Sequence, residues 1–233
     1  MASYESVIGI LEAELTAVAD AFGALTPDQW QRSTLLVPVD PDLPKWTVFE
    51  LAGHFDIAIG LTRMLIAEPE ETQPGRDRTS FFINPRSETG PVVYSYAYTM
   101  VEGKTPADMP GVLAETFAKT VSEARAVPAS LVGPGYFAPM RVDEFVASRI
   151  VEAVVHGIDL AQALGAPYFA TADGIAVTAA ILDDLLARRT TGRRPAARYA
   201  SSIRRMVTTA CAAEVGTGVP CAIAAANARS WPT

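Results

Sequence analysis

Two histidines and one glutamate are the residues whose types and spacing could bind a metal ion. The chain contains only two histidines, His54 and His156, and Glu152 lies four residues before the second of them. Side chains four apart lie on one face of a helix, one turn from each other. Two imidazoles and a carboxylate are the ligand set of a catalytic zinc site, in which a fourth coordination position stays open. The sequence therefore predicts a divalent-metal site formed by His54, Glu152 and His156.

The helices expected to carry these residues direct the three side chains toward the protein interior. On the helical wheel of residues 47–66, His54 shares a face with leucine, isoleucine and alanine side chains. A second helix, over residues 143–165, is apolar around most of its circumference and has a narrow polar stripe. The stripe consists of Arg149, Glu152, His156 and Asp159. Taken separately, the two features have other interpretations: a Glu and His pair on the surface, and a core histidine that bonds a backbone carbonyl.

Four long helices are expected in the main body of the chain. They cover residues 4–24, 47–66 and 143–165, and a stretch that begins after Asp108, or at Pro110, and reaches Ala126. Thr47 and Glu50 form the capping-box pattern that begins a helix, and Gly165 can take the left-handed conformation that ends one. Four helices with one long crossover, residues 68–104, indicate a mainly all-α protein built as a helical bundle.

The crossover is expected to be irregular because it is rich in proline and glycine. It contains the alternating stretch YSYAY, residues 94–98, which has the period of a short strand but could also form an aromatic wall. Tyr94 and Tyr96 are therefore candidates for substrate binding, and aromatic packing is the alternative.

Charge and composition limit the partners. The formal net charge of -7 argues against a nucleic-acid partner, since phosphate binding requires a basic surface. The first 25 residues lack the basic start of a signal peptide, and no segment has the length and apolar character of a membrane span. We expect a cytoplasmic protein that binds a small molecule and no membrane.

Two sequence patches resemble a known group of enzymes. PKWTVFELAGHFDIAIGLTRML, which contains His54, and SRIVEAVVHGIDLAQALG, which contains Glu152 and His156, resemble the DinB-like metalloenzyme superfamily, and within it the mycothiol-dependent maleylpyruvate isomerase family. The resemblance covers roughly residues 1–168. It implies a DinB-like four-helix bundle with a divalent metal, usually zinc, on His54, Glu152 and His156; nickel or iron would also suit these ligands.

The resemblance also implies a reaction. Family members use mycothiol, a low-molecular-weight thiol, as cosubstrate, so we expect a thiol S-transferase or isomerase that acts on a small electrophilic metabolite. Arg149 and Asp159 are candidates for supporting catalytic roles: Asp159, one turn from His156, could orient its imidazole, and a place on the helix surface is the alternative. A thiol-independent metalloenzyme of a biosynthetic pathway and a non-catalytic binding or dimerisation module are the other hypotheses.

The C-terminal part differs in composition from the bundle. Residues 169–233 are expected to form a short helical extension, separate from the bundle of residues 1–168, with an amphipathic helix over 173–189. Residues 188–205 contain seven arginines and no acidic residue. An arginine such as Arg198 could bind a carboxylate substrate. A solvated helix face or a homodimer contact is the alternative.

Overall fold

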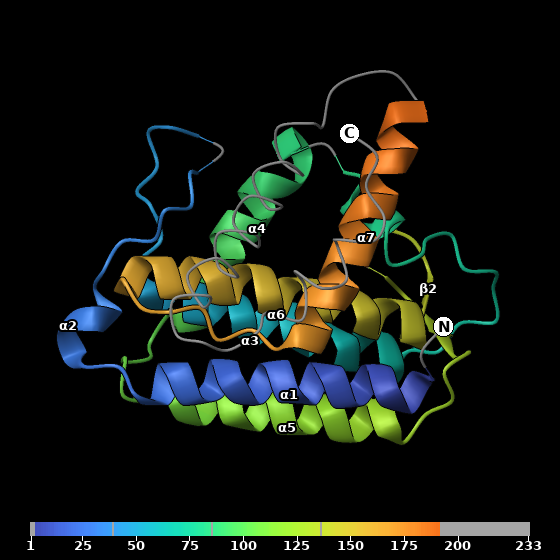
Figure 1. Cartoon of the computed structure of the whole chain (residues 1–233), viewed down its shortest axis with the longest axis horizontal. Helices are drawn as coiled ribbons and strands as arrows, with labels where there is room; N and C mark the ends of the chain where they lie inside the picture. Colours follow the sequence, from blue (N-terminus) through green and yellow to red (C-terminus); the bar gives the residue numbers. More distant parts are fainter. Residues whose placement is uncertain (1–2, 39, 85, 136, 192–233) are drawn as a thin grey trace, which may run out of the picture.

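Four long helices form the body of the protein. The computed structural model describes residues 3–38, 40–84, 86–135 and 137–191. The bundle helices are α1 (Tyr4–Gly23), α3 (Val48–Ala67), α5 (Met109–Arg125) and α6 (Val142–Leu164). Helices α1 and α3 each pack against both α5 and α6, which closes the bundle (Figure 1). The predicted all-α class is thereby confirmed.

Shorter elements complete the described chain. They are α2 (Pro27–Trp30), the 3-10 helix η1 (Ser80–Phe82), α4 (Arg86–Val101), the antiparallel strands β1 (Val132–Gly133) and β2 (Met140–Arg141), and α7 (Ala172–Thr191). In Figure 1, α4 and α7 rise from the same side of the bundle. None of the helices in the described ranges has the length and apolar character that a membrane span requires.

The bundle helices begin and end where the sequence places their signals. Thr47 and Glu50 form the capping box of α3: the Thr47 hydroxyl accepts from the Phe49 amide, and the Glu50 carboxylate accepts from the Thr47 amide at 2.7 Å. Helix α6 ends at Leu164, and Gly165 adopts a left-handed conformation with φ of 65°. The four helices then bury apolar faces of periodic side chains against one another.

The prediction of an irregular crossover over residues 68–104 is wrong for much of its length, because α4 occupies 16 residues of it. Pro91 lies inside this helix, although proline removes one helical hydrogen bond. Packing compensates for the lost hydrogen bond, because α4 lies against α3 and buries Ala97 and Val101 there. The strand interpretation of residues 94–98 is wrong for the same reason. With a helical period, Tyr94 and Tyr98 lie on one face, and their hydroxyl oxygens are 3.1 Å apart.

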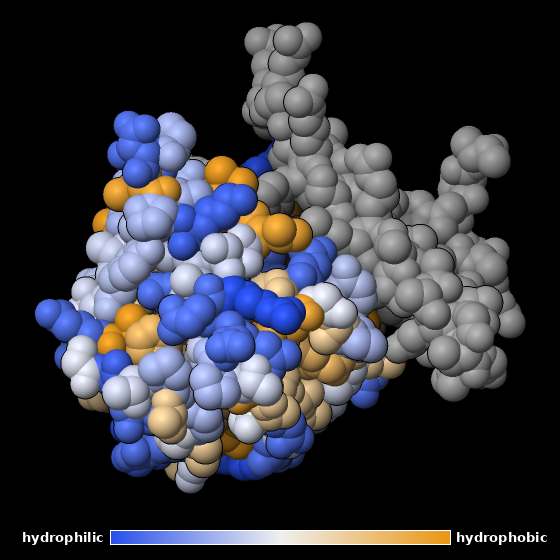
Figure 2. Space-filling view, turned by 90° about the vertical axis from the view of Figure 1, so that its left-hand side faces the viewer, coloured by the Kyte–Doolittle hydropathy of each residue, from blue (hydrophilic) through white to orange (hydrophobic). Residues whose placement is uncertain are grey.

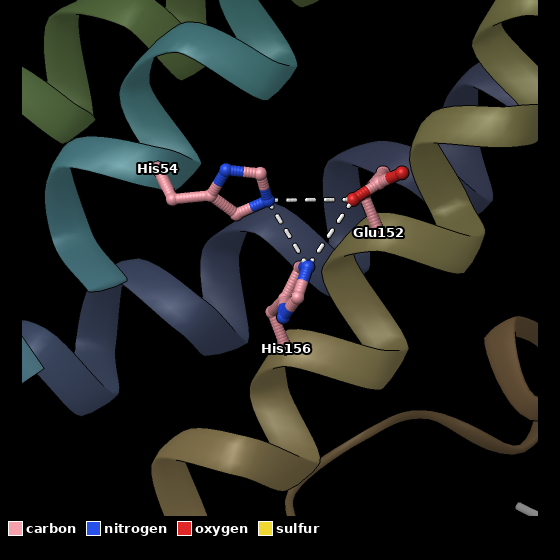
Figure 3. Close-up of side chains that lie close together, drawn as sticks. All are labelled: His54, Glu152 and His156. Carbon is pink, nitrogen blue, oxygen red and sulfur yellow. Dashed lines mark hydrogen bonds and ion pairs between the residues drawn. The ribbon is translucent and has the colours of Figure 1, made fainter. Parts of the chain in front are cut away.

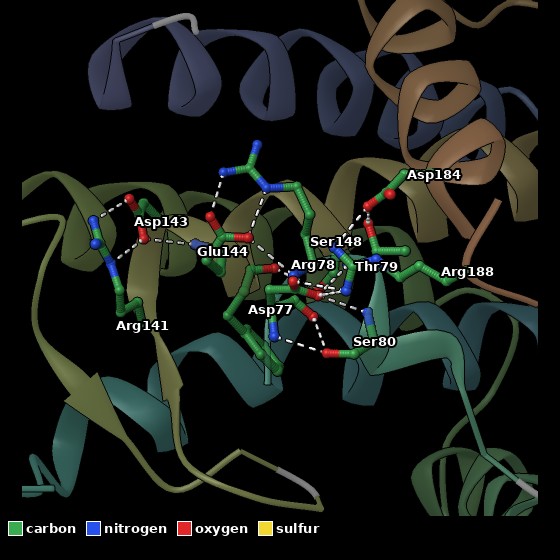
Figure 4. A network of polar contacts seen from close by, with 11 residues as sticks. Asp77, Arg78, Thr79, Ser80, Arg141, Asp143, Glu144, Ser148, Asp184 and Arg188 are labelled. Atoms are coloured by element: carbon green, nitrogen blue, oxygen red, sulfur yellow. Dashed lines mark hydrogen bonds and ion pairs between the residues drawn. The ribbon is translucent and has the colours of Figure 1, made fainter. Parts of the chain in front are cut away.

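Helix α7 confirms the amphipathic helix expected over residues 173–189. It packs on α6 and α1, and polar contacts tie it to the segment before η1 (Figure 4). Arg188 binds the Asp77 carboxylate at 2.8 Å, and the Thr79 hydroxyl donates to Asp184 at 2.7 Å. Arg188 is the first of the seven clustered arginines of residues 188–205. Arg198 lies outside the described residues, and the expected division at residues 168 and 169 stays a prediction.

A buried glutamate of α1 holds the start of α7. The Glu14 carboxylate is 1% exposed and accepts from the backbone amide of Thr171 at 2.8 Å and from its hydroxyl. The Thr171 hydroxyl in turn accepts from the Gly174 amide at 3.0 Å. A Cβ atom on Gly174 would lie 2.1 Å from a carboxylate oxygen of Glu14, so only glycine fits beside this contact.

We expect Gly174→Ala to lower the free energy of unfolding by about 1–3 kcal/mol, because Glu14 must leave its two hydrogen bonds to make room. Denaturant unfolding measures this cost. In a Glu14→Ala background, the same Gly174→Ala change should cost less than about 0.5 kcal/mol, since the colliding carboxylate is gone. Equal costs in both backgrounds would contradict the proposed contact.

Candidate metal centre

Three side chains from two bundle helices meet in the interior. His54 comes from α3, and Glu152 and His156 come from consecutive turns of α6 (Figure 3). The two histidine Nε2 atoms are 3.0 Å apart. Oε2 of Glu152 lies 3.6 Å from Nε2 of His54 and 3.3 Å from Nε2 of His156. The three residues predicted as ligands therefore do lie together; metal binding by them stays a prediction.

The dimensions of this triangle fit a divalent cation. Zinc binds imidazole nitrogen and carboxylate oxygen at about 2.0–2.2 Å, so ligand atoms of a tetrahedral zinc site lie roughly 3.3–3.5 Å apart. The three separations observed here, 3.0, 3.3 and 3.6 Å, bracket that value. Among the described residues these are the side chains grouped closely enough to hold a metal. Three protein ligands leave the remaining position for a small molecule.

Burial and hydrogen bonding set the charges of the three groups. Burial is the main reason that the pKa of His54 is lowered, which favours its neutral form. Burial also disfavours the Glu152 anion, but hydrogen bonds from His156 and His54 outweigh this and hold its pKa well below the usual range. Burial likewise opposes the charged form of His156, yet hydrogen bonds with Asp159 and Glu152 raise its pKa to about 10. The metal-free cluster thus contains one carboxylate and one imidazolium.

This charge state makes metal binding pH-dependent. A metal ligand must be neutral imidazole, so a cation that binds at pH 7 has to displace the proton from His156. With a pKa of about 10, we expect release of about one proton per metal at pH 7, and an apparent affinity that rises roughly tenfold per pH unit between about pH 6 and pH 9. Calorimetric titration with zinc in buffers of different ionisation enthalpy measures the released proton. A pH-independent affinity would contradict this.

Asp159 orients the second histidine. Its Oδ2 atom is 2.8 Å from Nδ1 of His156, on the side of the ring opposite Glu152. A proton on Nδ1 donates to this carboxylate and leaves the Nε2 lone pair directed toward His54 and Glu152. Nδ1 of His54, by contrast, is buried and has no hydrogen-bond partner among the described residues.

Asp159→Asn should weaken zinc affinity by about 10–100-fold, because the amide no longer stabilises the Nδ1 proton as strongly and the ring orientation is less fixed. It should also lower the pKa of His156, so that fewer protons are released on binding. Competition with a chromogenic chelator gives the affinity. An unchanged affinity together with unchanged proton release would assign Asp159 a surface role instead.

Arg149, expected on the polar stripe, is fully buried beside the cluster. It is 1% exposed, and its Nη2 atom lies 3.9 Å from Oε1 of Glu152. Its guanidinium donates to the Ala58 carbonyl at 2.9 Å and lies over the rings of both Phe81 and Phe145, 4.6 and 4.5 Å from their centroids. Arg149 is therefore placed behind Glu152, where it can balance the carboxylate charge.

A cavity of about 170 Å³ opens beside the two histidines. It is lined by Leu36, Val37, Pro38, Trp46, His54, Gly90, Val93, Tyr94 and His156. Of the two tyrosines predicted to bind substrate, Tyr94 lines the cavity, whereas Tyr96 is 43% exposed and is not among the lining residues. The Tyr94 hydroxyl donates to the Pro44 carbonyl at 2.7 Å, which fixes the ring beside the cavity.

Sequence reasoning missed Trp46 and the segment 36–38 as parts of this cavity. The indole of Trp46 lies between the rings of His54 and Tyr94, with centroid distances of 5.1 and 6.0 Å. Trp46 precedes α3 and residues 36–38 lie in a loop, so helical periodicity could not show where they point. The one available signal was the position of Trp46 just ahead of the helix that carries His54.

Comparisons with known proteins agree on the fold. The family model described as the mycothiol maleylpyruvate isomerase N-terminal domain matches residues 11–161. Among solved structures, the chain is similar to a histidine-to-alanine variant of the mycothiol-dependent maleylpyruvate isomerase, with 16% identity and a TM-score of 0.53. It is also similar to a second structure of that isomerase, with 15% identity and a TM-score of 0.50. Each likeness covers 78% of this chain and 68% of the other. No curated protein sequence matches significantly.

Proposed function

The chain belongs to the mycothiol maleylpyruvate isomerase N-terminal domain family, and on that premise we propose that it is a divalent-metal-dependent enzyme with mycothiol as cosubstrate. It acts as a thiol S-transferase or isomerase on a small electrophilic metabolite. The observation that carries the proposal is the convergence of His54, Glu152 and His156 at a cavity that both histidines line. Such a site can hold a cation and admit a small molecule to its open side.

Each neighbouring residue has a role in this proposal. His54, Glu152 and His156 hold the cation, and Asp159 keeps a proton on Nδ1 of His156, so that Nε2 is free to bind. When bound, the cation supplies Lewis acidity that favours the deprotonated form of a coordinating thiol. Trp46 and Tyr94 wall the cavity and keep bulk water from the reacting atoms.

The chemistry requires no oxidant. A thiolate attacks an electrophilic carbon of the second substrate, a sulfur to carbon bond forms, and the electron pair of the attacked π bond is protonated. The proton lost by the thiol and the proton gained by the product balance. If the adduct is kept, the reaction is a transfer; if it breaks after rotation about the former double bond, the reaction is an isomerisation.

Thiol consumption and product analysis test this function. Zinc-loaded protein is mixed with mycothiol and a panel of unsaturated carbonyl compounds, among them maleylpyruvate, and the loss of free thiol and the products are measured. We expect turnover that requires both metal and mycothiol and that Glu152→Gln abolishes. Glu123→Gln on the outer side of α5, which removes only a surface ion pair with Arg63, is the matched control. Equal turnover without mycothiol would favour a thiol-independent metalloenzyme, and no metal- or thiol-dependent turnover of any kind would contradict the proposal.

A further inference from the structure

We propose that the cavity beside the candidate metal centre binds an uncharged, flat, ring-sized electrophile and discriminates against dicarboxylates. This inference rests on the proposed function, because it names the class of the second substrate for the same site. The proposed uncharged substrate differs from maleylpyruvate, the dianion that gives the family its name.

The walls of the cavity are the first argument. Five of the nine described residues that line it are aliphatic, proline or glycine, and those with polar side-chain atoms are the two histidines of the metal centre, Tyr94, and Trp46, whose Nε1 atom is buried. The Tyr94 hydroxyl is already engaged, since it donates to the Pro44 carbonyl and lies 3.1 Å from the Tyr98 hydroxyl. Tyr94 therefore offers its ring to a ligand, and the surface it presents is apolar.

The size and shape of the space are the second argument. A cavity of about 150 Å³ with apolar walls holds a benzene molecule, and this one measures about 170 Å³. The Trp46 and Tyr94 rings beside it are nearly parallel, with an angle of 23° between their planes. Aromatic rings that line a cavity contact a flat partner in offset-stacked or edge-to-face arrangements, which favours such a partner by about 0.5–1.5 kcal/mol beyond simple burial. A planar ring system fits this space and these walls.

Charge is the third argument. Among the described residues, none of the nine that line the cavity is lysine or arginine. Arg149, which lies beside the metal centre, contacts the rings of Phe81 and Phe145 and Glu152 and is not among the residues that line the cavity. A second carboxylate that entered would lose its hydration without gaining a cation from these walls, which costs several kcal/mol.

The surroundings of the cavity also favour an apolar ligand. The segment before α3 and the exposed side of α4 carry apolar side chains that reach solvent: Leu35, Val37, Leu43, Val93 and Tyr96. Figure 2 views the molecule from the side on which the segment before α3 lies, and apolar side chains gather on the upper part of this face. Val37 and Val93 also line the cavity, so apolar side chains run from its wall to the surface, as expected for a site that binds an apolar ligand.

An aryl enone has these properties: a flat ring, no charge and an electrophilic β carbon. Thiol addition to such an enone forms a sulfur to carbon bond at the β carbon. The thiol proton is balanced by the proton that the α carbon gains.

A binding experiment without thiol tests the inference separately from the reaction. The probe is benzylacetone, the saturated and unreactive analogue of the enone benzylideneacetone, and calorimetry on the zinc-loaded full chain measures its Kd. We expect benzylacetone to bind at least about tenfold more tightly than its para-carboxylate or the dianion maleate. Equal or tighter binding of either anion, or no binding of benzylacetone, would overturn the inference.

A charge introduced into the wall gives a second, independent measurement. Val93→Arg places a cation at the cavity, so the para-carboxylate should gain about tenfold in affinity while benzylacetone loses affinity. Ser95→Arg, on the same helix but exposed and outside the lining residues, is the matched control and should change neither Kd. If Ser95→Arg shifts the preference as much as Val93→Arg does, the cavity is not the binding site.

The two proposals can fail separately. Tight benzylacetone binding without thiol consumption from benzylideneacetone would support the ligand class and contradict the proposed reaction. Thiol consumption confined to dicarboxylates would support the reaction and overturn the ligand class.

Discussion

Replacing His54 by alanine should reduce bound zinc from about one equivalent to below about a tenth of an equivalent after reconstitution and desalting. In the proposed site three ligands would hold the cation, and the loss of one leaves only Glu152 and His156 on α6, a set too small for tight binding. Metal-dependent turnover should fall at least about a thousandfold, since a bound cation contributes several kcal/mol to stabilising the transition state. Metal analysis by mass spectrometry and the thiol-consumption assay measure the two effects.

Folding controls are needed because His54 is 7% exposed and packs against Trp46. His54→Gln keeps a similar volume and a polar end, so it should fold with the same helical content and still bind no zinc. The variant with Glu123→Gln on the surface of α5 should retain both metal and turnover. Full metal content in both His54 variants would contradict the assignment of this cluster as the metal site.

Zinc should also stabilise the unsubstituted protein. A ligand that binds only the folded state adds RT ln(1 + [L]/Kd), about 4 kcal/mol at a thousand times the Kd. The melting temperature should therefore rise with zinc in the unsubstituted chain and in Glu123→Gln, and not in His54→Gln. A chelator should reverse the rise.

The elements that could be predicted from the sequence are those whose own residues mark where a helix begins, continues and ends. The bundle helices have apolar residues at helical spacing, a capping box at Thr47 and a closing glycine at Gly165, and each begins and ends within a few residues of expectation. Helix α4 has no such signal. Pro91 and the neighbouring glycine favour a loop, and the helix forms because it packs on α3 through Ala97 and Val101.

The candidate site shows the same division. His54, Glu152 and His156 could be predicted because histidine is scarce here and because helical spacing fixes which face each residue occupies. The cavity could not be predicted from the sequence, because Trp46 and residues 36–38 lie in segments without a periodic pattern of apolar residues. The burial of Arg149 could not be predicted either, because it depends on contact with the ring of Phe81, a residue far away in the sequence.

Outside the three proposed metal ligands, Arg149 is the residue whose loss should cost most. In the metal-free protein, Arg149→Met should lower the free energy of unfolding by about 3–5 kcal/mol, as expected when one partner of a buried charge pair is removed. The Ala58 carbonyl and the Ser148 hydroxyl lose their guanidinium donors, and Glu152 loses the guanidinium that lies 3.9 Å from its carboxylate. Denaturant unfolding of the metal-free variant measures this loss.

The role of Arg149 can be separated from that of a metal-site residue by repeating the measurement with zinc. A bound cation balances the Glu152 charge in place of the guanidinium, so Arg149→Met should cost less stability with saturating zinc than without it. By linkage, zinc affinity in this variant should then be higher. Arg141→Met is the matched control, because it removes a half-exposed ion pair with Asp143 at the start of α6. It should cost less than about 1 kcal/mol of stability both with and without zinc. A loss of zinc affinity at unchanged stability would instead mean that Arg149 positions Glu152 for the metal, rather than balancing its charge in the folded core.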